Sequence, residues 1–133
     1  MRIHHIGIVV ADIEAELVNY VQSFGVEFTH RERLETLGVD VAIALLPGGG
    51  EIELLSPIGE DTGIAKFLRE RGQGMHHVAY TVANLSDALV ICRERGIELI
   101  DDVPRRGAGN TQVAFLHPRS TGRVLIELVQ SEQ

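Results

Sequence analysis

Apolar and polar positions follow the same order twice along the chain. Residues 3–10 and 75–82 are apolar runs of strand length, and each contains a His-His pair near its start. After each run, apolar residues recur every three or four positions, which predicts one helix over 13–24 and another from about 85 to 95. An Asp or Asn that can cap a helix N-terminus stands just before each helix.

The remaining elements also recur in order. The pattern predicts short extended segments at 26–28 and 97–99, strands at 39–46 and 111–116, and closing strands at 52–55 and 125–128. Each half is therefore expected to have the order strand-helix-strand-strand-strand (βαβββ). We expect one domain over 1–133, with repeats at about 1–58 and 74–131 joined by a linker at 59–73 that carries a short helix from about 62 to 71.

The two His-His pairs each place one histidine on a roomy strand face. Side chains alternate between the faces of a strand, so His5 shares a face with Gly7, and His77 shares one with Ala79. Small neighbours leave space for a ligand above these histidines. The companions His4 and His76 point to the opposite, bulkier face and are expected to pack or to form hydrogen bonds. One residue of each pair is therefore a candidate for chemistry.

The closing strand of each repeat holds a single carboxylate among apolar residues. Glu53 lies between Ile52 and Leu54, and Glu127 lies in the same place in the second repeat. Burying an unpaired carboxylate is costly, so each of them needs a partner. A lone histidine or glutamate in a strand is usually structural, but matched positions in two repeats favour a shared ligand. His5, Glu53, His77 and Glu127 together suit a divalent metal such as Co, Ni, Mn, Fe or Zn.

Composition narrows the class of protein. Twelve basic and nineteen acidic residues give a net charge of −7, which argues against nucleic acid as a partner. No apolar run approaches the roughly 18 residues that span a bilayer, and the N-terminus has neither a signal-peptide nor a transit-peptide pattern. The single cysteine, Cys92, excludes an intrachain disulfide and a CxxC zinc site, so we expect a reducing, cytoplasmic setting.

The βαβββ repeat with these four positions resembles the vicinal oxygen chelate (glyoxalase/bleomycin resistance/dioxygenase) superfamily. Within it, the chain is most similar to the methylmalonyl-CoA epimerase family. The resemblance covers nearly the whole chain, and its clearest stretches are residues 3–8, 51–57, 64–68, 74–79 and 115–128. It implies an α+β fold in which the paired βαβββ modules form a cupped, barrel-like mixed sheet, and a homodimer.

The resemblance also implies a chemistry. His5, His77 and Glu127 match metal ligands, and Glu53 matches a fourth position that is Gln in some members; the metal would be a divalent ion (Co, Mn, Ni, Zn or Mg). The implied reaction is isomerisation of an acyl-CoA thioester: metal-dependent epimerisation of methylmalonyl-CoA by α-proton transfer through a metal-stabilised enolate. Glu53 and Glu127 are then also the acid-base candidates.

The chain departs from part of the family in the strand at 39–46. Some members have a glutamate base there, and the matching position in this chain is Ala42. Asp40, two residues away on the same strand face, is the candidate replacement. Arg123 also stands where many members have Gly.

Three further side chains are candidates for a role at the site. Arg105 and Arg106 precede a Gly-Ala-Gly loop that could reach an anionic substrate, although a solvated charge cluster is the simpler interpretation. His117 precedes Pro118 at a turn, and we expect it to be structural.

Two other functions fit the same fold. Glyoxalase I (lactoylglutathione lyase), acting on a glutathione hemithioacetal, also uses a His/Glu/His/Glu metal set. A non-catalytic protein that binds a small molecule would keep the fold without needing the metal set. An extradiol dioxygenase is disfavoured, because its iron site needs only one carboxylate.

Overall fold

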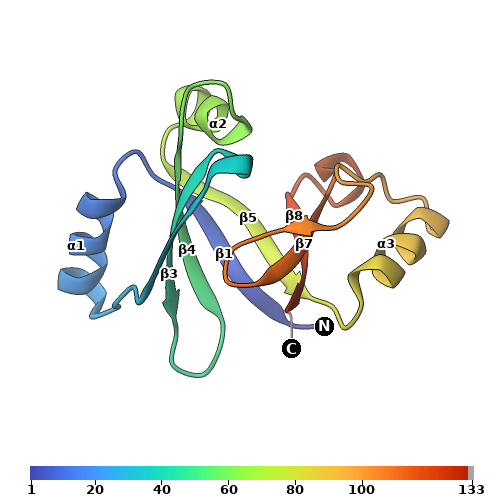
Figure 1. Ribbon diagram of the computed structural model, residues 1–133, viewed down its shortest axis with the longest axis horizontal. Coiled ribbons are helices and arrows are strands. Elements are labelled where there is room, and N and C mark those ends of the chain that lie inside the picture. Colours follow the sequence, from blue (N-terminus) through green and yellow to red (C-terminus); the bar gives the residue numbers. More distant parts are fainter. Residues whose placement is uncertain (132–133) are drawn as a thin grey trace. The chain divides into compact units, whose positions relative to one another are not determined.

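The structure is a computed structural model, and it describes residues 1–131. The chain forms two compact units, drawn in Figure 1. The first unit comprises Ile6–His76. The second comprises Met1–His5 and the chain from His77 onward. None of the helices within residues 1–131 is long and apolar enough to cross a bilayer.

The first unit contains a run of antiparallel strands flanked by two helices. Its elements are β1 (Ile3–Val9, from Ile6), α1 (Ile13–Phe24), β2 (His30–Leu34), a 3₁₀ turn (Glu35–Leu37), β3 (Val39–Leu45), β4 (Glu51–Pro57) and α2 (Gly63–Arg71). The strand order is β2-β3-β4-β1, and β3 pairs antiparallel with both β2 and β4. β2 is therefore the edge strand of this unit.

The second unit repeats this plan. Its elements are β5 (Gly74–Thr81, from His77), α3 (Leu85–Glu94), β6 (Arg105–Arg106), β7 (Thr111–Leu116), a 3₁₀ turn (Pro118–Ser120) and β8 (Ile126–Ser131). The strand order is β5-β8-β7-β6, with β5 parallel to β8 and the other pairs antiparallel. The predicted α+β class with two βαβββ modules is confirmed.

Side-chain caps explain where the helices begin. The Asp12 carboxylate accepts a hydrogen bond from the amide of Ala15, and the Asn84 side chain accepts one from the amide of Asp87. These bonds satisfy amides of the first turn that have no partner within the helix. At the end of α1, Gly25 takes a left-handed conformation with φ 65°.

In each unit, the helix that follows the first strand, α1 or α3, packs on one face of the strands and so distinguishes their two faces. In the first unit, Val10, Ala42 and Leu54 cluster with Ile13 of α1. In the second unit, Leu85 and Leu89 of α3 cluster with the strand residues Ala114, Leu116 and Leu128. Because side chains alternate along a strand, the neighbours of these residues point away from the helix.

The second strand of each module was placed wrongly by the sequence pattern. The predicted segments 26–28 and 97–99 contain no named strand; β2 and β6 lie further along the chain. Phe28 instead packs beside the α1 cluster, and Leu99 packs beside the α3 cluster and makes a single bridge to Leu116. The apolar pattern marked residues that fill the core, whereas the strands themselves are strongly charged.

Candidate metal and acid-base site

Three of the four predicted ligands meet in the second unit. The Nε2 atoms of His5 and His77 lie 2.9 Å apart. A carboxylate oxygen of Glu127 lies 3.3 Å from His5 Nε2, and the other lies 4.0 Å from His77 Nε2. All three side chains are buried, with 3%, 4% and 6% of their surface exposed. The expected grouping of these residues is therefore present.

Strand alternation and register bring these side chains together. His5 lies on β1 and His77 on β5, and β5 runs parallel to β8 with Ala79 opposite Glu127. On the other side of β8, Phe115 of β7 lies opposite Glu127. These side chains point away from α3, because their neighbours along β7 and β8 pack against that helix.

The surroundings of the two histidines fix their rings. The Nδ1 atoms of His4 and His5 are 2.8 Å apart, so one of these nitrogens donates a hydrogen bond and the other accepts it. The His77 ring meets the Phe115 ring edge-on, with the centroids 5.3 Å apart. Phe115 is itself held by Asp101, whose carboxylate accepts a hydrogen bond from the Phe115 amide at 2.8 Å. Contacts of this kind orient the nitrogens of a ligand group.

The donor set fits a divalent metal ion. His5, His77 and Glu127 each offer one ligand atom, and these atoms all lie within 4.8 Å of one another. Two imidazole nitrogens and one carboxylate are the ligand types that bind divalent transition metals. A metal held here by three protein groups would keep coordination positions for further ligands.

Glu53 lies in the first unit. It is on β4 opposite Ile43, and only 7% of its surface is exposed. It points away from α1, since its neighbour Leu54 belongs to the cluster beneath that helix. The structure thus places Glu53 as a buried carboxylate, in agreement with its expected burial.

Asp40 lies on the wrong face to replace a base beside Glu53. Ala42 packs with Leu54 under α1, and Asp40 shares that face because it is two residues away on β3. The Asp40 carboxylate lies 3.5 Å from the Arg33 guanidinium. The prediction that Asp40 and Ala42 share a face is correct, but that face is directed toward α1, whereas Glu53 points the other way.

Two other histidines have the structural roles expected of them. The His76 ring packs edge-on against Phe67 of α2, and burial, together with the positive charge of Arg71, lowers the pKa of His76. His117 accepts a hydrogen bond from the Arg119 amide at 3.1 Å and so caps the 3₁₀ turn that follows it.

Arg105 and Arg106 form the short strand β6 and are both exposed. Arg105 forms an ion pair with Asp101 and lies over the Phe115 ring. The following glycine is required by packing, because a Cβ on Gly107 would come within 2.7 Å of Thr111 and Val113.

Sequence reasoning missed the contact of Phe115 with His77. The signal was available in the repeat, since Phe115 lies 72 residues after Ile43, and the two residues oppose the two glutamates of the closing strands.

The family can now be assigned. The sequence model that describes the Glyoxalase/Bleomycin resistance protein/Dioxygenase superfamily matches residues 4–115 of this chain. The chain belongs to this superfamily. Among its relatives in this superfamily is the ethylmalonyl-CoA/methylmalonyl-CoA epimerase of Cereibacter sphaeroides, which is 35% identical over 131 residues that cover 97% of both chains.

Solved structures from the superfamily agree with the sequence relatives. The methylmalonyl-CoA epimerase of Mycobacterium tuberculosis superposes with a TM-score of 0.94 at 35% identity, over 98% of this chain and 88% of that chain. A variant of the Streptomyces coelicolor epimerase in complex with 2-nitronate-propionyl-CoA gives the same TM-score at 36% identity, over 98% and 94% of the two chains. These matches confirm the expected fold.

Proposed function

We propose that this protein is a methylmalonyl-CoA epimerase, an isomerase that interconverts the two epimers of an acyl-CoA thioester. The observation that carries the proposal is a buried His/Glu group in a chain that is 35% identical, over 97% of both lengths, to an ethylmalonyl-CoA/methylmalonyl-CoA epimerase. A solved epimerase of the same fold binds 2-nitronate-propionyl-CoA, which supports an acyl-CoA substrate.

In this proposal His5, His77 and Glu127 hold a divalent metal ion, and Glu53 is the fourth ligand. The short distances among the first three support their role, and the burial of Glu53 in an otherwise apolar strand supports the fourth. When bound, a divalent ion supplies a Lewis acid that polarises the thioester oxygen and acidifies the α-proton.

The chain's own residues move the proton. Glu53 and Glu127 are the acid-base candidates, because a carboxylate can take a proton from the α-carbon and its acid form can return one. Buried apolar neighbours on the same strand faces, Leu55 beside Glu53 and Val129 beside Glu127, keep water away from these carboxylates. A water-poor setting strengthens the electrostatic interactions on which proton transfer from carbon depends.

The enzyme is proposed to act in the cytoplasm as a homodimer. The single, free Cys92 is consistent with a reducing compartment. Exposed apolar side chains of α1, including Val18 and Phe24, provide surface that a second copy could cover. Light scattering on the purified protein measures the oligomeric state directly.

The proposal is tested by incubating one epimer of methylmalonyl-CoA with the cobalt-loaded protein and following the other epimer by chiral chromatography. We expect equilibration to a mixture of both epimers. The hemithioacetal of methylglyoxal and glutathione serves as the comparison substrate. Turnover of the hemithioacetal without epimerisation would identify a glyoxalase, and binding of the thioester without turnover would identify a binding protein.

A further inference from the structure

The edge strand β2 places a carboxylate on the same sheet face as Glu53. In the paired strands β2, β3 and β4, residues in register point to the same side. Glu32 lies opposite Val41, which is two residues before Ile43, the partner of Glu53. Glu32 therefore points away from α1, as Glu53 does.

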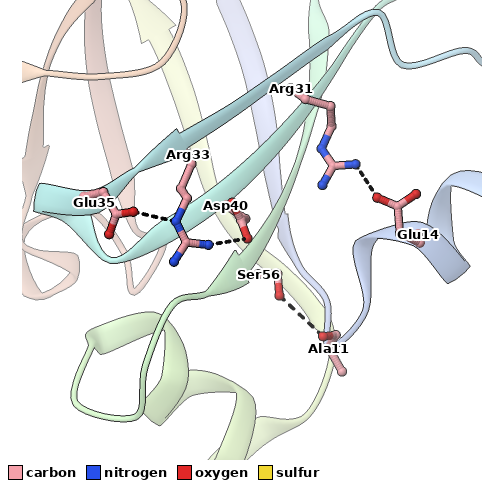
Figure 2. Close-up of polar contacts among 7 residues, drawn as sticks. All are labelled: Ala11, Glu14, Arg31, Arg33, Glu35, Asp40 and Ser56. Atoms are coloured by element: carbon pink, nitrogen blue, oxygen red, sulfur yellow. Dashed lines mark hydrogen bonds and ion pairs between the residues drawn. The ribbon is translucent and has the colours of Figure 1, made fainter.

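The residues on either side of Glu32 confirm this orientation. Arg31 forms an ion pair with Glu14 of α1, and Arg33 contacts Glu35 and Asp40 on the same side of the sheet (Figure 2). Since neighbouring side chains of a strand point to opposite faces, the carboxylate between these two arginines points to the other face.

Glu32 is largely buried and is held by a neighbour. Its side chain is 16% exposed, against 69% for Glu35 just beyond the strand. One Glu32 oxygen lies 3.2 Å from Nε2 of His30, two residues earlier on the same face. The half-exposed histidine can orient the carboxylate and exchange a proton with solvent.

The reaction needs an acid-base group on each side of the substrate carbon, and β3 offers none on this face. The side chains of Val39, Val41 and Ile43 are apolar and buried there. Glu51 also shares the face of Glu53, but it lies at the end of β4 opposite Leu45, which is 68% exposed.

The spacing of Glu32 and Glu53 suits a substrate between them. They are two strands apart and two residues out of register, which puts their Cα atoms roughly 12 Å apart. Both side chains rise from the same face and are flexible, so they can lean across it and bring their carboxylates to either side of one substrate carbon.

We propose that Glu32, in place of Glu127, is the acid-base partner of Glu53, an inference that rests on the proposed function. Glu127 then serves as a metal ligand only, in keeping with its position 3.3 Å from Nε2 of His5. The Glu32 carboxylate takes the α-proton from one side of the carbon, and the electron pair of the broken C–H bond passes into the thioester carbonyl. The acid form of Glu53 gives a proton to the other side, so one C–H bond breaks and one forms. Solvent then restores both carboxyl groups, through His30 in the case of Glu32.

The test is Glu32→Gln, assayed by NMR in D2O with each epimer of methylmalonyl-CoA separately. We expect interconversion to fall by at least about 100-fold. One epimer should still exchange its α-proton for deuterium without inverting, because the base on the opposite side remains. Asp40→Asn and Glu35→Gln are matched controls that remove a nearby carboxylate charge, and both should interconvert the epimers at the wild-type rate.

Cobalt affinity and circular dichroism of Glu32→Gln are measured in parallel and should match those of the wild type. Wild-type interconversion by this variant would overturn the inference and leave the proposed function standing. Equal loss of exchange for both epimers, or weakened cobalt binding, would show that Glu32 is structural and would also overturn it. A wild-type protein that does not interconvert the epimers overturns the proposed function itself.

Discussion

The proposed chemistry of this protein rests on individual residues at matching positions of the two repeats. Glu53 lies opposite Ile43, and Glu127 lies opposite Phe115. These carboxylates were recognisable in the sequence because a single charge inside an apolar strand is costly unless it has a partner. The two histidines were recognisable because the His-His pair recurs after 72 residues and alternation separates its members. Glu32 was not recognisable, because nothing marked its charged segment as a strand.

His76 and His77 offer an internal comparison for the metal site. His77 lies within the His/Glu group, whereas His76 packs against Phe67 on the other face. His77→Ala should weaken cobalt binding by more than the ~10–100-fold that loss of an outer-shell partner causes. His76→Gln should leave the affinity unchanged. Calorimetric titration of the metal-free proteins measures both, and equal affinities for the two variants would count against His77 as a ligand.

Arg123 is held in a conformation that favours glycine. Its φ is 70°, a left-handed value that is costly for a residue with a side chain. Arg123→Gly should therefore raise the free energy of unfolding by about 0.5–1 kcal/mol. This value is the strain that glycine relieves, reduced by the stabilisation of the unfolded state that comes from the greater flexibility of glycine. Urea denaturation measures the change. Arg95→Gly, at φ −90°, is the control and should destabilise the protein; a similar loss from Arg123→Gly would contradict the account.

At the scale of elements, periodicity predicted the helices and most strands, and their bounds agree with the structure within a few residues. The exception is the second strand of each module. β2 and β6 are edge strands in which most residues are charged, so they carry no alternation of apolar and polar positions. Their positions follow from hydrogen bonding to β3 and β7, which a local pattern does not contain.

A local sequence pattern also could not show that Asp40 is unsuited to replace a base beside Glu53. Alternation correctly grouped Asp40 with Ala42, but which face of β3 is turned toward α1 depends on tertiary packing. The structure decides that point through the cluster of Ala42 with Leu54 and Ile13.

Helix α3 allows the packing of an element to be tested. Leu89 is 1% exposed within the cluster of the second unit, whereas the adjacent Val90 is 48% exposed. Leu89→Ala should lower the free energy of unfolding by about 2–5 kcal/mol, through lost burial and the cavity left behind. Val90→Ala should change it by less than about 0.5 kcal/mol. Comparable losses in urea denaturation would mean that α3 is not anchored through Leu89.

For the molecule as a whole, the duplicated βαβββ pattern is what allowed the function to be inferred from the sequence. Each unit turns one face of its strands to a helix and carries a buried carboxylate on the other, Glu53 in the first unit and Glu127 in the second. In the sequence, each repeat supplies one histidine and one glutamate to this set, and His5 of the first repeat lies in the second unit. Relatives named as epimerases match the chain at about 35% identity over nearly its full length.

The proposed activity depends on metal-assisted removal of an α-proton, which interconverts the epimers of methylmalonyl-CoA. The most direct measurement is proton NMR of methylmalonyl-CoA in D2O with the cobalt-loaded protein, with and without a chelator. The α-proton signal should disappear, the methyl doublet should collapse to a singlet, and both changes should stop once the chelator has removed the metal. Retention of the α-proton in the cobalt-loaded protein, or exchange that is indifferent to the chelator, would contradict the proposed activity.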